Sequence, residues 1–111
     1  MKLLPTLKQK RRYVVFEVIG ENNFTLSEIK EEVERALQQF WGDLGKSRAV
    51  VVFIDEKFNP EKQRFMLKVN HKYVDELKMG LALSKKIKNN PIIFKSVVSS
   101  GTIKKASSNL V

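Results

Sequence analysis

The order in which two hydrophobic periodicities follow one another along the chain is what most constrains its fold. Segments rich in β-branched and aromatic residues, with strand-like patterning, alternate with segments in which apolar residues recur at helical spacing. Strands are expected over residues 13–19, 49–54, 62–69 and 92–98, and helices over residues 26–41 and 71–87. This order is that of the split βαβ arrangement. We therefore predict an α/β fold of the α+β sandwich type, ferredoxin-like or RNA-recognition-like, with a four-stranded antiparallel sheet and helices mainly on one face.

The first helix has a well-marked start. Thr25 and Glu28 have the spacing of a capping box, and Phe24 and Ile29 stand where a hydrophobic staple would close. The helix is expected to end at Gly42. For the second helix, Asn70 is a suitable N-cap and the Asn-Asn-Pro sequence at 89–91 is a stop signal.

The strand at 62–69 alternates so regularly that its two faces can be assigned. One face carries Gln63, Phe65, Leu67 and Val69, and the other carries Lys62, Arg64, Met66 and Lys68. With both helices on one side of the sheet, the cationic face is expected to be open. The strands at 13–19 and 49–54 nevertheless carry apolar residues on both faces, which an open face does not need. Either contact with a partner, or coverage by terminal segments or a small extra helix, would explain that surplus.

The length and composition indicate one folded domain. A chain of 111 residues with 42% hydrophobic residues can bury a single core, and it has no apolar run long enough to cross a bilayer. The first residues lack the apolar run of a signal peptide, so a cytoplasmic protein is expected. We divide the chain into a single RNA-recognition-like domain over 1–111, with a basic N-terminal arm at 1–12 and a basic, polar C-terminal segment at 99–111.

The charged residues are sorted along the chain. All 12 Asp and Glu lie between Glu17 and Glu76, whereas the charged residues before and after are all Lys or Arg, so the two ends sum to +12, the middle to −3 and the whole chain to +9. This distribution predicts a surface for a polyanion built by both termini.

Few residues could support catalysis by the protein itself. His71 is the single histidine and there is no cysteine, which excludes the usual nucleophilic triads. Asp55 and Glu56 are adjacent at a strand end, where a solvated turn is expected rather than a metal site. An acylphosphatase needs a phosphate-cradling loop with an arginine after the first strand, but the loop at 20–23 is acidic and has none. We predict no catalytic residues and no metal ligands in the protein.

The basic clusters favour RNA binding. Arginine can bind phosphate with two hydrogen bonds or stack on a base, and tyrosine offers a ring face. The expected RNA-binding residues on this basis are Lys8, Lys10, Arg11, Arg12 and Tyr13 in the first segment and Lys104 and Lys105 in the last. The alternative is a solvated basic arm without a ligand. Because the face of the 62–69 strand lacks aromatic platforms, shape and backbone recognition of folded RNA is expected.

A second surface is expected to contact protein. Met79 and Leu83 lie roughly opposite the core-facing stripe of the second helix. An acidic helix face such as that of the first helix, Glu28, Glu31 and Glu32, is usually only solvated, but it would repel RNA and could meet a basic partner protein.

Four segments in order carry a resemblance to a known family: Pro-Thr-Leu-Lys at 5–8, Lys-Arg-Arg-Tyr-Val-Val-Phe-Glu-Val at 10–18, Gly-Asp-Leu-Gly at 42–45 and Ser-Gly-Thr-Ile-Lys-Lys at 100–105. Together they resemble archaeal ribonuclease P protein component 2 over nearly the whole chain. The resemblance implies a subunit that helps a catalytic RNA, which carries Mg²⁺, to remove the 5′ leader of precursor tRNA. It implies no cofactor in the protein, and it implies pairing with protein component 3 and other protein subunits. A homodimer within a heterotetramer is one arrangement consistent with this.

The resemblance also adds residues to the expected RNA contacts. Gly101 would let the backbone approach the RNA, and Arg48 is a further candidate. The alternative function is another structured-RNA-binding protein of the same fold, such as a ribosomal or RNA-chaperone module.

Overall fold

The computed structural model describes residues 10–110, which form five strands and three α-helices. The elements are β1 (Arg11–Gly20), α1 (Leu26–Ala49), β2 (Val52–Phe53), β3 (Arg64–Asn70), α2 (Val74–Ala82), β4 (Lys86–Ile87), β5 (Asn90–Ser100) and α3 (Ile103–Ser107). Short 3-10 turns, η2 (Asp55–Lys57) and η3 (His71–Tyr73), precede β3 and α2. The strands form one sheet in the order β2-β3-β1-β5-β4, and every neighbouring pair is antiparallel.

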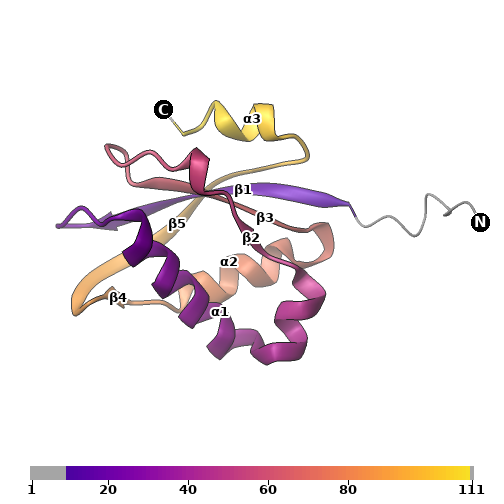
Figure 1. The fold of residues 1–111 in the computed structure, drawn as a ribbon, viewed down its shortest axis with the longest axis horizontal. Helices are drawn as coiled ribbons and strands as arrows, with labels where there is room; N and C mark the ends of the chain where they lie inside the picture. The colour runs from indigo at the N-terminus through magenta and orange to yellow at the C-terminus, as the bar shows by residue number, and fades with distance from the viewer. Residues whose placement is uncertain (1–9, 111) are drawn as a thin grey trace, which may run out of the picture.

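The sheet is covered on both faces. Helices α1 and α2 lie against one face, and α3 lies on the opposite side (Figure 1). The α+β class and the antiparallel sheet are confirmed, and the sheet has five strands instead of the four that the sequence predicted.

Helix α1 begins where the sequence predicts. The side chain of Thr25 accepts a hydrogen bond from the backbone of Glu28, and the Glu28 carboxylate accepts one from the backbone of Thr25, which completes a capping box. The sequence predicted that the helix would end at Gly42. It instead continues after a kink at this residue, where φ is 70° and ψ is −173°. Almost only glycine adopts this conformation, so Gly42 turns the chain without ending the helix.

Because α1 continues beyond Gly42, the strand that follows it is shorter than predicted. Ala49, expected to open a strand, is instead the last residue of the helix, and Val50 has the left-handed conformation of a C-cap. Only Val52 and Phe53 pair with β3, opposite Lys68 and Leu67.

The second helix is also shorter than predicted. It was expected to span residues 71–87, but α2 ends at Ala82, and the chain then turns into β4. Ile87 is buried in the core from β4, and the buried hydroxyl of Ser84 bonds to α1. Burial of these two side chains holds the segment in an extended conformation, against its helical pattern.

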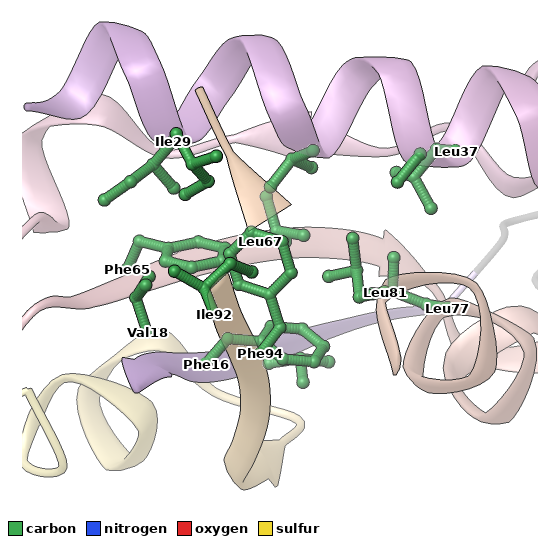
Figure 2. Close-up of a cluster of buried hydrophobic side chains, with 14 of the residues drawn as sticks. Phe16, Val18, Ile29, Leu37, Phe65, Leu67, Leu77, Leu81, Ile92 and Phe94 are labelled. Carbon is green, nitrogen blue, oxygen red and sulfur yellow. The ribbon is translucent and has the colours of Figure 1, made fainter. Parts of the chain in front are cut away.

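The main core lies between the sheet and the pair α1 and α2. It combines the inward faces of β1, β3 and β5 with the apolar stripes of both helices (Figure 2). The ring of Phe65 is at its centre, stacked on Phe16 at 5.7 Å and on Phe53 at 5.2 Å, and in edge contact with Phe94 at 5.6 Å. The predicted inward face of the 62–69 strand is confirmed by these contacts.

A second, smaller core lies on the other face. Val15 and Met66 are fully buried there beneath Ala106 and Leu110, which belong to α3 and the turn after it. The prediction of an open face and a polar tail is therefore wrong, and a small extra helix explains the surplus of apolar residues. The side chain of Arg64 donates to the carbonyl of Asn109 at 2.7 Å, which fastens the segment after α3 to the sheet.

Candidate nucleic-acid interface

The two basic ends of the chain meet at one end of the sheet. β1 begins there, with Arg11 opposite Asn70 at the end of β3 and Tyr13 opposite Ser100 at the end of β5. The backbone N–H of His71 donates to the carbonyl of Lys10 at 2.9 Å, which extends the pairing by one residue. This end of the sheet is on the right in Figure 1. We call it the basic end.

One side of the basic end is a polar groove of about 310 Å³. Its lining residues are Arg12, His71, Lys72, Val74, Asp75, Lys78 and Ser99. The guanidinium of Arg12 bonds only weakly, to the carbonyl of Arg11 at 3.4 Å, and forms no ion pair with any residue in the range 10–110. Three cations against one carboxylate make this groove attractive to a phosphate.

The other side of the basic end faces α3. Because neighbouring residues of a strand point to opposite faces, Tyr13 lies across the sheet from Arg12. The ammonium of Lys68 is 6.0 Å from the centre of the Tyr13 ring. Lys104 and Lys105, both exposed, lie in the first turn of α3.

The structure brings most of the predicted RNA-binding residues together. A Cβ atom placed on Gly101 would be 3.1 Å from a guanidinium nitrogen of Arg12, so the head and tail of the described chain are in contact. Arg48 is exposed in the last turn of α1, which ends at the same end of the sheet (Figure 1). Lys8 lies outside the described residues.

Two lysines and a histidine of the polar groove were not predicted from the sequence as RNA contacts. His71, Lys72 and Lys78 reach the basic end because η3 and α2 follow directly from the end of β3. The antiparallel register of β1 and β3, which no local motif encodes, is the signal that would have identified them.

The predicted protein-binding residues lie on α1 and α2. Met79 is 60% exposed and Leu83 is 64% exposed. Leu83 borders a groove of about 240 Å³ between the two helices, which is also lined by Arg35, Gln39 and Phe40. Glu31 is exposed.

The acidic face of α1 is smaller than predicted. Glu32 is not on a solvent face: it is only 9% exposed, and its carboxylate accepts hydrogen bonds from Ser84 and from Arg35, the latter at 2.6 and 2.9 Å. Burial by itself raises the pKa of Glu32, but the hydrogen bonds from Arg35 and Ser84 and the charges of nearby cations outweigh it and lower the pKa below the usual 4.5.

Glu28 is also engaged within the chain. The hydrogen bond from the backbone of Thr25 is the main cause that lowers the pKa of Glu28 below 4.5, and Lys88 adds an ion pair at 3.4 Å. The carboxylates that α1 can offer to a partner are thus fewer than its sequence indicates.

Residues 10–110 offer neither a metal site nor a membrane span. Nowhere in this range do three His, Cys, Asp or Glu side chains gather in a way that could hold a metal ion. No helix of the described part is long and apolar enough to cross a membrane.

The chain is similar to known proteins over nearly its whole length. The model of the Rpp14/Pop5 family matches residues 12–111. Ribonuclease P protein component 2 of Thermococcus kodakarensis is 41% identical over 103 residues, covering 93% of this chain and 84% of that protein. The protein of the same name from Methanocaldococcus jannaschii is 28% identical over 106 residues, covering 94% of this chain and 75% of that protein.

The fold also matches a solved structure. A chain in the cryo-EM structure of yeast ribonuclease MRP superposes with a TM-score of 0.66 at 11% identity, covering 86% of this chain and 76% of that one. The family match spans the basic end, the core and α3. The chain therefore belongs to the Rpp14/Pop5 family of ribonuclease P protein subunits.

Proposed function

We propose that this chain binds the catalytic RNA of ribonuclease P through the basic end and supports it in removing the 5′ leader of precursor tRNA. The observation that carries this proposal is the meeting of both basic segments at one end of the sheet. Cations gathered on one surface bind an RNA backbone more strongly than the same cations spread over the molecule.

The chemistry is assigned to the RNA, with Mg²⁺ expected at the RNA and not in the protein. With one histidine and no cysteine, the chain offers few groups for catalysis, whereas the cations of its basic end are suited to neutralising phosphates and fixing RNA geometry. We expect it to act in the cytoplasm.

The fold assignment can also be made finer. Without β4, the strand order is β2-β3-β1-β5, and the elements follow one another as strand, helix, strand, strand, helix, strand. This is the ferredoxin-like arrangement, to which we assign the core, with β4 and α3 as additions.

Exposed apolar side chains on α2 support a protein-binding role for the opposite surface. Met79 and Leu83 project from the outer side of α2, beside the groove to α1. Isolated exposed apolar residues are common, but two at helical spacing beside a groove are typical of a contact surface. We assign them to protein component 3, with a homodimer within a heterotetramer as the expected assembly.

Reconstitution tests the function. The protein, added with protein component 3 to ribonuclease P RNA, should raise the rate of precursor-tRNA cleavage, whereas a ribosomal or RNA-chaperone module of the same fold would not. Cleavage of the leader by the protein without RNA would contradict the proposal.

A salt titration tests the surface. The double variant Arg12→Gln and Lys105→Gln should flatten the slope of log affinity against log salt by about 0.7–0.9 for each phosphate that the variant no longer neutralises. The matched control is Lys62→Gln with Lys95→Gln, which removes the same charge away from the basic end. An equal change of slope in both pairs would rule out a localised surface.

A further inference from the structure

A second groove lies beside the basic end, on the α3 side of the sheet. It has a volume of about 500 Å³, within the range of roughly 300–1,000 Å³ that small-ligand sites occupy. Its floor and walls include Tyr13, Val52, Ile54, Glu56, Lys68 and Ile103. These residues come from β1, the segment of β2 and η2, β3 and the start of α3.

The walls of this groove are apolar and partly open to solvent. Val52 is 49% exposed and Ile103 is 40% exposed, although both are large aliphatic residues. Tyr13 lines the same groove; its side chain is half-buried, and the ammonium of Lys68 lies over its ring, 6.0 Å from the ring centre. A partly exposed lysine over a ring is held weakly, so a flat ligand could take its place on the ring. An aromatic ring that shares a groove with aliphatic side chains suits the flat, apolar surface of a nucleobase.

The polar end of the groove carries two carboxylates with different surroundings. Asp55 is paired with Lys30, at 3.2 Å. Glu56 is exposed and makes no hydrogen bond or ion pair with another residue between 10 and 110. A carboxylate repels phosphate, so this end of the groove does not fit the RNA backbone.

A carboxylate does accept two parallel N–H groups. Among the bases, guanine presents two such donors side by side, N1–H and the 2-amino group, whereas adenine and cytosine present one donor beside an acceptor. The free carboxylate of Glu56 therefore favours guanine over these two bases.

The groove is continuous with the basic end. Ile103 at its rim is followed directly by Lys104 and Lys105. A nucleotide with its base in the groove would thus have its neighbouring phosphates within reach of cations.

We propose that this groove, in a protein that acts on RNA as described above, binds an unstacked guanine from a single-stranded segment. The base stacks on Tyr13, its N1–H and 2-amino groups donate to Glu56, and Lys104 and Lys105 contact the flanking phosphates. This adds base recognition to the backbone contacts of the basic end.

The test uses the full chain and short labelled RNAs at low salt. One RNA has a single guanine in the middle of a uridine tract, and its partners have adenine or an abasic site at that position. Fluorescence anisotropy should show the guanine RNA binding about tenfold more tightly than the abasic RNA, in line with the contribution of base stacking.

Variants separate the edge contact from the stacking. Glu56→Gln should remove most of the preference for guanine over adenine and change the affinity for abasic RNA no more than a charge-matched control does. Glu61→Gln is the matched control, because it removes the same charge from an exposed residue in the turn just before β3 that does not line the groove. Tyr13→Leu should lower the affinity for the guanine RNA and the adenine RNA towards that for the abasic RNA.

Three outcomes would contradict the proposal that the groove binds guanine. Equal affinity for guanine and abasic RNA, with the salt dependence retained, would end this inference and leave the proposed function standing. A guanine preference that survives Glu56→Gln would also overturn it. If neither RNA binds, the groove is rejected, and the cleavage assay decides separately about the proposed function.

Discussion

Single residues set the local geometry on which the site depends. Gly42 turns α1 with a backbone conformation that almost only glycine adopts, and Gly101 lets the chain after β5 pass close to Arg12. Glu32, which the sequence pattern indicates as a solvent-facing acid, is instead a buried hydrogen-bond acceptor. Burial and partners decide the role of such residues, and side-chain type alone does not.

A substitution at Gly42 tests the kink. Gly42→Ala should lower the free energy of unfolding by about 1–3 kcal/mol, although there is open space for the new methyl group, because its φ of 70° is strained for alanine. The measurement is urea denaturation followed by circular dichroism. The control Ser47→Ala, exposed on the same helix, should change the free energy by less than about 0.5 kcal/mol. A Gly42→Ala protein as stable as the wild type would show that the kink is not strained.

The carboxylate of Glu32 should make stability depend on pH. Its pKa is lowered in the folded state, so its contribution is complete above about 4.5 and is lost as the pH falls below 4.5 through the folded pKa. Glu32→Gln removes this titration. The difference in melting temperature between pH 7 and pH 3 should therefore be smaller in the variant than in the wild type, as measured by differential scanning calorimetry.

Glu31→Gln is the matched control, since this exposed neighbour on α1 has none of these contacts. An identical acid dependence in the wild type and Glu32→Gln would contradict the assignment.

At the scale of elements, α3 links the second core to the basic end. Its inner side chain, Ala106, closes over Val15 and Met66, while its first turn presents Lys104 and Lys105. Helix α1 is linked to the loop between α2 and β4 by Glu32 and Ser84 in a similar way. Each of these links joins segments that are far apart in the sequence.

Displacing α3 should affect stability and binding together. Ala106→Arg places a large side chain where the existing one is fully buried, which should cost about 1–3 kcal/mol and detach the helix. RNA affinity should fall although the substitution adds a positive charge, because the two lysines of α3 lose their position. Anisotropy and thermal unfolding measure the two effects.

The control for this variant is Ser108→Arg, which adds the same charge at an exposed position of the turn after α3. It should keep the stability and hold or raise the RNA affinity. If the affinity of Ala106→Arg for RNA equalled that of the wild type, the position of α3 would not matter for binding.

At the scale of the whole molecule, the fold separates two surfaces. The basic end collects cations from β1, α2, β3 and α3, while the outer side of α2 keeps its exposed apolar residues next to the groove to α1. The cations gathered at the basic end would steer an RNA to that side of the protein.

The polar groove tests whether the RNA-binding surface extends to α2. Its cations come from β1, η3 and α2, which the fold brings together, and not from one basic run of the sequence. Lys72→Gln with Lys78→Gln should lower the slope of log affinity against log salt by about 1.4–1.8, as expected for two phosphate contacts. The pair Lys62→Gln and Lys95→Gln again serves as the control. A slope unchanged by the first pair would remove the α2 side from the RNA-binding surface.

Much of the fold could be predicted from local patterns. The capping box at Thr25, the alternation that buries Phe65 and Leu67, and the order of the main elements were all visible in the sequence. The predicted boundaries failed where contacts between distant segments outweighed local preference. Ile87 was assigned to a helix by its period and is held in β4 by the core.

The sequence by itself determined the class of fold, the sorting of charge to both ends of the chain and the family. These properties depend on residue type, and on neighbours a few positions apart. Only the tertiary structure decided that Arg12 lies against Gly101, that Lys72 and Lys78 join the basic end, and that α3 closes the second face. Contacts of this kind depend on strand register and on packing between segments separated by tens of residues, which local sequence preferences do not encode.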